Sequence, residues 1–296
     1  MLISTVLEHL RTAGLSGLIR LLTVEQWAAI DAEYLGLTTS GNRSEADVET
    51  ATSTAQSPSV TVPPRNMGAL AGQLMLVALM LTLQKYFGHR RALEDVFGIS
   101  FKGLAWPGLW GQVYWAWFSS LTYLLPPMLF AWLVHRDTPR DYGLSLKGAR
   151  HHLPLYLLLF CGVAPMVFLA SGSAQFQQRY PFYQQAGNSW PELIIWELSY
   201  GFQFLALEYF FRGFMLFPLA RQIGSAAIFV MVVPYCMIHF AKPFPETVGA
   251  ILAGTILGTL ALRTRSVLGG VLIHLAVAWS MDGLALWRKG ALGQLF

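Results

Sequence analysis

Three short stretches near the carboxyl end place ionisable side chains inside otherwise apolar sequence. LEYFFRGF carries Glu208 and Arg212, four residues apart and therefore neighbours on one helix face. PYCMIHF ends at His239 after Tyr235, and LIHLAVA contains His274. Carboxylates and imidazoles are the side chains that transfer protons, stabilise charge in a reaction or bind a metal ion. The three stretches could therefore form one chemical site, if the fold brings them together.

Two further carboxylates belong to the same region. Glu197 precedes Glu208 by eleven residues and falls within roughly 20° of the same helix face. Asp282 follows His274 by two helical turns. A simpler interpretation is also open, in which Glu208 and Arg212 are a self-neutralising ion pair and each histidine is a hydrogen-bonding strut. The fixed order of a Glu–Arg pair followed by two histidines favours a functional site.

The elements that must position these side chains are membrane helices. Hydrophobic residues make up 54% and charged residues 12% of the chain, and the mean hydropathy is +0.47. A soluble domain carries about 25% charged residues. Apolar blocks of about 20 residues are long enough to cross a bilayer as helices. The sequence predicts an all-α, polytopic membrane helix bundle of about seven transmembrane helices (six to eight), at 67–86, 107–134, 153–171, 191–220, 222–241, 246–263 and 266–287.

Helical spacing allows the ionisable side chains to meet inside this bundle. If the loops at 221 and 264–265 share a membrane side, Glu208, His239 and His274 lie about 18 Å, about 25 Å and about 12 Å below it. The sixth block has Ala250, Gly254 and Gly258 at four-residue spacing, a small-residue face that lets helices approach closely. We therefore expect the three side chains to converge near the middle of the membrane.

The amino-terminal quarter has a different character. Residues 1–37 alternate apolar and charged positions at helical spacing, which indicates an amphipathic segment that docks on a partner or on the membrane surface. The partner is not indicated, and charges at Glu8 and Arg11 argue against a cleaved signal peptide. Residues 38–66 are rich in Ser, Thr, Ala and Pro, which is typical of a flexible linker. The transmembrane bundle is expected over 67–290.

Charge and cysteine content bear on nucleic-acid binding, on membrane topology and on disulfide bonds. The net charge of +4 does not indicate nucleic acid, because basic residues are expected at the ends of membrane spans. Over seven spans, the side of the amino terminus collects 11 Lys and Arg residues and the opposite side 8, which favours a cytoplasmic amino terminus. Cys161 and Cys236 are too few for a disulfide framework.

LEYFFRGF, PYCMIHF and LIHLAVA together resemble the three motifs of the CPBP (Abi) family of intramembrane proteases. This family includes the type II CAAX prenyl proteases and bacteriocin-immunity proteins, and its pattern is EExxxR, FxxxH and HxxxN. The resemblance covers about residues 191–287, within a family-like core expected at about 153–290. It implies an intramembrane endopeptidase of a bacterial cytoplasmic membrane, acting on a membrane-associated peptide or protein.

The resemblance also assigns roles to individual residues. Glu208 and Arg212 match the second Glu and the Arg of the first motif, and His239 and His274 match the histidines of the other two. Glu208 with His239 would activate water, His274 would stabilise the oxyanion, and Arg212 would orient Glu208.

The chain departs from the pattern in two places. Leu207 stands where the family has its first Glu, and Ala278 stands where the third motif has Asn. Glu197 is the expected substitute carboxylate, and Asp282 is the less favoured one. Alternatively, the chain is a catalytically inactive relative that binds a peptide in an immunity or scaffold role.

Two other kinds of chemistry are weighed against this one. Two histidines and one glutamate are also a zinc ligand set, which makes Glu208, His239 and His274 an alternative metal site. Because the sequence has no HExxH spacing, we expect no cofactor and rank zinc second. A proton-coupled transporter is less favoured still, because inverted repeats with broken helices are not evident.

Overall fold

The structure, a computed structural model, describes residues 24–36, 67–145 and 149–295. Within these ranges the regular elements are helices and no strand occurs, which confirms the all-α prediction. Five helices are long and apolar enough to cross a membrane, and they cover Met67–Phe87, Pro107–His135, His152–Ala170, Phe244–Thr264 and Leu268–Arg288. The chain is therefore a multi-pass membrane protein, while the predicted number of seven spans stays a prediction.

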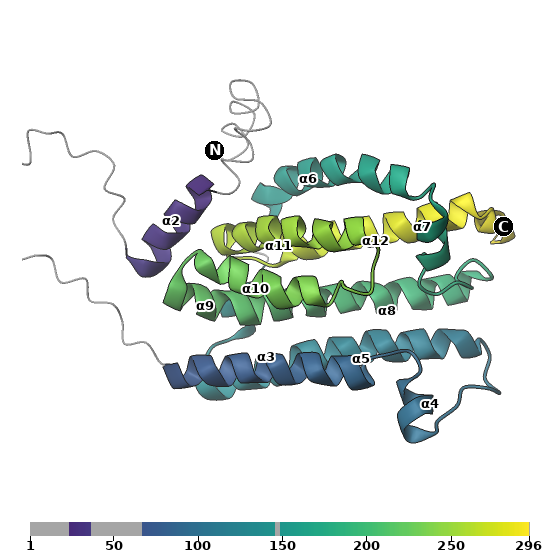
Figure 1. The fold of residues 1–296 in the computed structure, drawn as a ribbon, viewed down its shortest axis with the longest axis horizontal. Coiled ribbons are helices and arrows are strands. Elements are labelled where there is room, and N and C mark those ends of the chain that lie inside the picture. Colours follow the sequence, from purple (N-terminus) through teal and green to yellow (C-terminus); the bar gives the residue numbers. More distant parts are fainter. Residues whose placement is uncertain (1–23, 37–66, 146–148, 296) are drawn as a thin grey trace, which may run out of the picture.

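The long helices run side by side along the length of the molecule (Figure 1). α3 (Met67–Phe87) and α5 (Pro107–Phe130) lie along one side, and α6 (Ala149–Ala170) lies along the other. Between them are α8 (Trp190–Glu208), α9 (Leu216–Ile223), α10 (Ala226–Met237), α11 (Phe244–Thr264) and α12 (Leu268–Arg288). The short helices α4 (Ala92–Phe97) and α7 (Ala174–Arg179) lie at one end of the bundle. α8 packs against both α5 and α12.

Among the described residues, the π-helical segment Tyr209–Met215, which joins α8 to α9, is deeply buried. All seven of its residues are buried, as expected for a helix with apolar side chains around most of its circumference. The wider turn changes the backbone hydrogen-bond pattern, and Gln73 of α3 donates from Nε2 to the carbonyl oxygen of Phe214 at 2.8 Å. This segment carries Arg212, so the irregular turn lies at the predicted site.

α2 (Val24–Leu35) packs against the end of the bundle that lies opposite α4 and α7. Asp31 accepts a hydrogen bond of 2.6 Å from the backbone N–H of Ser225, and Trp27 donates to Thr259 at 3.0 Å. The apolar side chain of Ile30 is fully buried. Of the amphipathic segment predicted over 1–37, the described part thus docks on its own chain. The linker predicted over 38–66 lies outside the described residues.

Small residues of α11 allow α10 to approach it closely. A side chain at Gly254 would meet Val232 and Tyr235 of α10, and one at Gly258 would meet Met231 and Ile228. The small-residue face predicted from the sequence therefore packs against α10. This contact holds Tyr235, which is 1% exposed, at its position in the interior.

Candidate functional site

The carboxylate of Glu208 is the centre of a buried polar cluster. Glu208 Oε1 lies 3.1 Å from Arg212 Nη1 and 2.6 Å from His274 Nδ1. The Glu208 and Arg212 side chains are 1% and 0% exposed, whereas His274 is 17% exposed. Arg212 and His274 both lie against the Glu208 carboxylate, so its negative charge is balanced within the apolar interior. His274 is the member of the cluster that a small molecule could reach.

The pairing of Glu208 with His274 depends on the antiparallel packing of α8 and α12. The end of α8 meets the beginning of α12, and Gly270 lies directly against the Glu208 side chain. A Cβ atom at position 270 would overlap the Glu208 carboxylate, so this position must lack a side chain. One turn further along α12, His274 reaches the same carboxylate.

Tyr235 connects the cluster to α10. Its hydroxyl lies 3.1 Å from His274 Nε2, and the guanidinium of Arg212 lies 3.8 Å from the centre of its ring. Nδ1 of His274 lies 2.6 Å from Glu208 Oε1, so the two ring nitrogens of this histidine lie against Glu208 and Tyr235 respectively. The result is a continuous chain of contacts from Arg212 through Glu208 and His274 to the Tyr235 hydroxyl.

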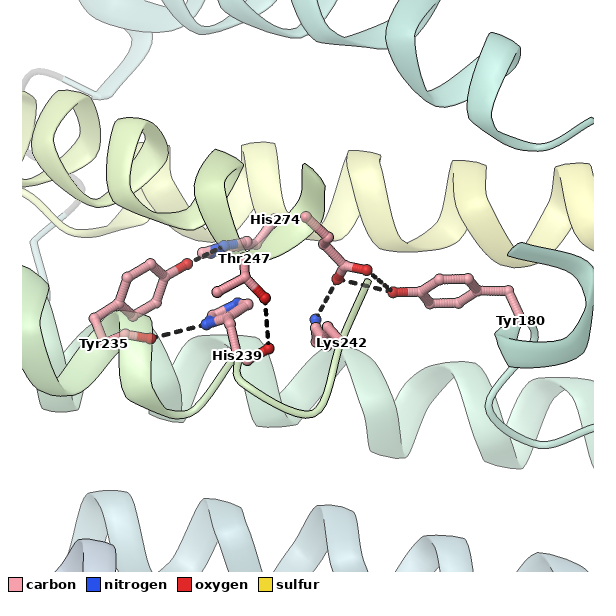
Figure 2. A network of polar contacts seen from close by, with 7 residues as sticks. Tyr180, Tyr235, His239, Lys242, Thr247 and His274 are labelled. Atoms are coloured by element: carbon pink, nitrogen blue, oxygen red, sulfur yellow. Dashed lines mark hydrogen bonds and ion pairs between the residues drawn. The ribbon is translucent and has the colours of Figure 1, made fainter. Parts of the chain in front are cut away.

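His239 lies in the turn that follows α10, beside Tyr235 (Figure 2). Its Nδ1 donates to the backbone carbonyl oxygen of Tyr235 at 2.8 Å, and its own carbonyl accepts from Thr247 at 2.8 Å. A carbonyl oxygen only accepts, so the neutral ring carries its proton on Nδ1 and its lone pair on Nε2. Nε2 is therefore the ring nitrogen that can accept a hydrogen bond.

Two predictions from the sequence need correction here. Glu208 pairs with Arg212 and His274, whereas His239 contacts the backbone carbonyl of Tyr235. Glu197 does not join the cluster either, although it shares a helix face with Glu208. Eleven residues separate the two along the helix, which is a distance of about 16 Å.

Glu197 instead has Asp282 as its charged neighbour. Asp282 is fully buried, and its Oδ2 accepts a hydrogen bond of 2.8 Å from Trp196 Nε1. Asp282 therefore lies in the interior of the bundle. The two predicted substitute carboxylates therefore lie with each other, away from Glu208.

The two positions that depart from the family pattern are packed with apolar side chains. Leu207 is 7% exposed and belongs to the largest apolar cluster of the described residues. Ala278 is 6% exposed and packs in a cluster with Trp196 and Tyr200. Neither position offers a polar group, so their functions must be supplied by other residues or are absent.

The residues of the alternative zinc set are not arranged as a set of metal ligands. Within the described parts of the chain, no group of three or more His, Cys, Asp and Glu side chains is placed to hold a metal ion. Glu208 and His274 contact each other directly, and His239 is turned toward a backbone carbonyl. The cluster does not fit a zinc site, and we derive no step through a metal ion.

Sequence reasoning did not identify two residues that shape the cluster. The ring of Phe204 stacks on His274 with the ring centres 5.4 Å apart, and Gly270 provides the space for Glu208. Phe204 lies one turn before Glu208 on α8. This spacing points to a contact with His274 only once α12 is known to pack against α8. The contact of Tyr235 with His274 also carries no local signal in the sequence, because it joins two different helices.

Comparison with known proteins supports the family resemblance. Residues 189–280 match the family model described as Rce1-like, type II CAAX prenyl endopeptidase Rce1-like. The matched range contains Glu208, Arg212, Tyr235, His239 and His274. Neither a curated protein nor a solved structure matches the chain. The region that builds the polar cluster is therefore similar to the type II CAAX prenyl endopeptidases, which confirms the CAAX-protease-like resemblance inferred from its motifs.

Proposed function

We propose that this protein is an intramembrane endopeptidase that hydrolyses a peptide bond of a membrane-associated substrate. The observation that carries the proposal is the 2.6 Å contact between Glu208 and His274, deep in a bundle of membrane helices. Burying charged groups among apolar helices is costly, so such groups mark functional sites in membrane proteins. The match of this region to a peptidase family supports the same reaction class.

His239 is the proposed general base. Its Nε2 carries the lone pair of the neutral ring, because Nδ1 donates to the Tyr235 carbonyl. A water molecule hydrogen-bonded to Nε2 would lose a proton to this nitrogen as its oxygen attacks the carbonyl carbon of the substrate. The protonated ring can then give the proton to the leaving amine, as microscopic reversibility allows.

Tyr235 is the proposed oxyanion donor, and His274 is the residue that positions its hydroxyl. His274 lies between Glu208 and Tyr235, with Nδ1 2.6 Å from Glu208 Oε1 and Nε2 3.1 Å from the Tyr235 hydroxyl. When Nε2 carries a proton, it donates this proton in a hydrogen bond to the Tyr235 oxygen. This leaves the Tyr235 O–H free to donate to the oxyanion of the tetrahedral intermediate. Tyr235 would thereby supply the donor that Ala278 lacks. Arg212 neutralises Glu208 and places its guanidinium over the Tyr235 ring.

The surroundings of His239 favour a substrate that lies in the membrane. Met237 and Phe240 flank this histidine in the chain and are 54% and 67% exposed. A segment approaching the site along α10 therefore meets an apolar surface that is suited to lipid or to a hydrophobic peptide.

Peptide cleavage by the purified protein tests this function. The full chain in neutral detergent would be incubated with a library of membrane peptides, with and without a chelator, and the products identified by mass spectrometry. We expect cleavage that is unaffected by the chelator. Loss of cleavage on chelation, restored by added zinc, would replace this mechanism with the zinc alternative, and no cleavage at all would contradict the peptidase proposal.

Tyr235→Phe is expected to lower kcat/KM for the cleaved peptide by about 10²-fold, the lower end of what one oxyanion donor contributes. The change removes only the hydroxyl and keeps the ring beneath Arg212. Tyr209→Phe is the matched control, because the Tyr209 hydroxyl is buried and has no hydrogen-bond partner among the described residues. Equal rates for the two variants would show that Tyr235 is not an oxyanion donor.

A second candidate function is a peptide-binding relative without catalytic activity. It is favoured by the apolar packing of Leu207 and Ala278, which leaves two family positions without polar groups. Such a protein would retain a peptide from the library without cleaving it. Binding of an intact peptide that is weakened by Tyr235→Phe would support this candidate over the peptidase.

A further inference from the structure

A cavity outside the polar cluster lies at the end of the bundle where α3 ends and α5 begins. It has a volume of about 320 Å³. Its lining includes the side chains Arg90, Arg91, Glu94, Lys102, Gln112 and Gln184. The segment from 88 to 106 connects two helices that are long enough to cross a membrane. The cavity must therefore lie near the level of the lipid headgroups.

The cavity carries an excess of positive charge. Three of its lining side chains are cationic and one is acidic. Lys102 lies 3.7 Å from Glu94, whereas neither Arg90 nor Arg91 forms an ion pair with an acidic side chain of the described residues. Two guanidinium groups without an anionic partner suit a phosphate group.

The surface beside the cavity is apolar. Phe97, Ile99 and Leu104 are each more than half exposed, and Trp106 is also exposed. Exposed apolar side chains of this kind are stable in the lipid interface, where Trp is especially frequent. The same segment thus offers cations to a phosphate and apolar side chains to acyl chains. A soluble phosphate compound would use only the first of these features.

The geometry points to a binding site for the headgroup of an anionic phospholipid in this cavity. Arg90 and Arg91 contact the lipid phosphate, and the acyl chains lie against Phe97 and Leu104. The site is separate from the Glu208 cluster and does not depend on the proposed peptidase function. It would fix the depth of the segment from 88 to 106 in the membrane.

Lipid titration of the full-length protein in neutral detergent tests this site. Dioctanoyl phosphatidylglycerol, dioctanoyl phosphatidylcholine and inorganic phosphate would be compared by native mass spectrometry and by the shift in thermal unfolding midpoint. We expect only the anionic lipid to bind and to raise the midpoint. Arg90→Gln with Arg91→Gln is expected to weaken this binding by about 30-fold, because each basic residue contributes about 1 kcal/mol near an anionic lipid.

Two further double variants make the result specific. Arg90→Lys with Arg91→Lys keeps both charges and should retain most of the binding. Arg136→Gln with Arg140→Gln removes the same charge beyond the other end of α5 and should have no effect on it. Unchanged lipid binding by the Arg90→Gln, Arg91→Gln variant would overturn the proposal. Equal stabilisation by inorganic phosphate would also overturn it, by assigning the cavity to a soluble anion.

Discussion

His274→Gln is expected to lower the rate of peptide cleavage by about 10³-fold, within the range of a group that transfers or donates a proton in the transition state. The glutamine side chain has a similar reach, but it lacks the two ring nitrogens that lie against Glu208 and Tyr235. His274 is 17% exposed and Arg212 remains beside Glu208, so the variant should fold normally. The measurement is single-turnover cleavage of the peptide identified in the library, together with thermal unfolding of the same sample.

His89→Gln is the matched control for this change. His89 lies between α3 and α4, and its side chain is 41% exposed next to Asp95. Its replacement should leave the cleavage rate unchanged. If His274→Gln kept a rate within tenfold of the wild type while remaining folded, the Glu208–His274 pair would be structural and the proposed oxyanion role would be wrong.

Arg212→Gln is expected to lower the free energy of unfolding by about 3–5 kcal/mol, because it leaves a buried carboxylate without its strongest partner. The Glu208 and Arg212 side chains are 1% and 0% exposed, so water cannot replace the missing charge. The loss also removes the cation that lies over the Tyr235 ring. Unfolding by sodium dodecyl sulfate in mixed micelles would measure the change.

Arg221→Gln provides a close comparison. Arg221 lies 3.0 Å from Asp137, nearly the same distance as in the buried pair, but the two side chains are 41% and 21% exposed. An exposed ion pair contributes about 0–1 kcal/mol, so this change should cost little. Equal costs for the two variants would contradict the view that Glu208 remains charged in the interior. Adding Glu208→Gln to Arg212→Gln should recover part of the loss, because no buried charge then remains.

Part of this protein could be predicted from local sequence. Hydrocarbon requires long apolar helices, so the helix class and most long helices follow from the lengths of the apolar blocks. The pairing of Glu208 with Arg212 also follows from local geometry, since four residues make about one helical turn. The block predicted over 222–241 is different, because α10 contains only 12 residues and ends before His239. His239 lies in the turn that follows α10, and this turn allows its ring to bond to the Tyr235 carbonyl oxygen.

Which side chains form the site depends on how α8 and α12 are aligned along their lengths. Glu208 and His274 are separated by 66 residues, and they meet because α12 packs antiparallel to α8 with Gly270 against the carboxylate. The same register places Glu197 beside Asp282 instead of near Glu208. Sequence spacing determines which face of a helix a side chain occupies. It does not determine which side chain of another helix lies at the same depth.

Sequence by itself therefore determined the membrane-helix class, the ion pair within one helix and the set of residue types available for chemistry. Tertiary structure alone decided that His274 contacts Glu208, that Tyr235 bridges to His274, and that α2 docks on its own chain. The physical reason is that helix formation depends on neighbouring residues, whereas these contacts depend on how side chains pack between helices. A single glycine or a short turn can change how two helices pack, and this changes which side chains of the two helices are in contact.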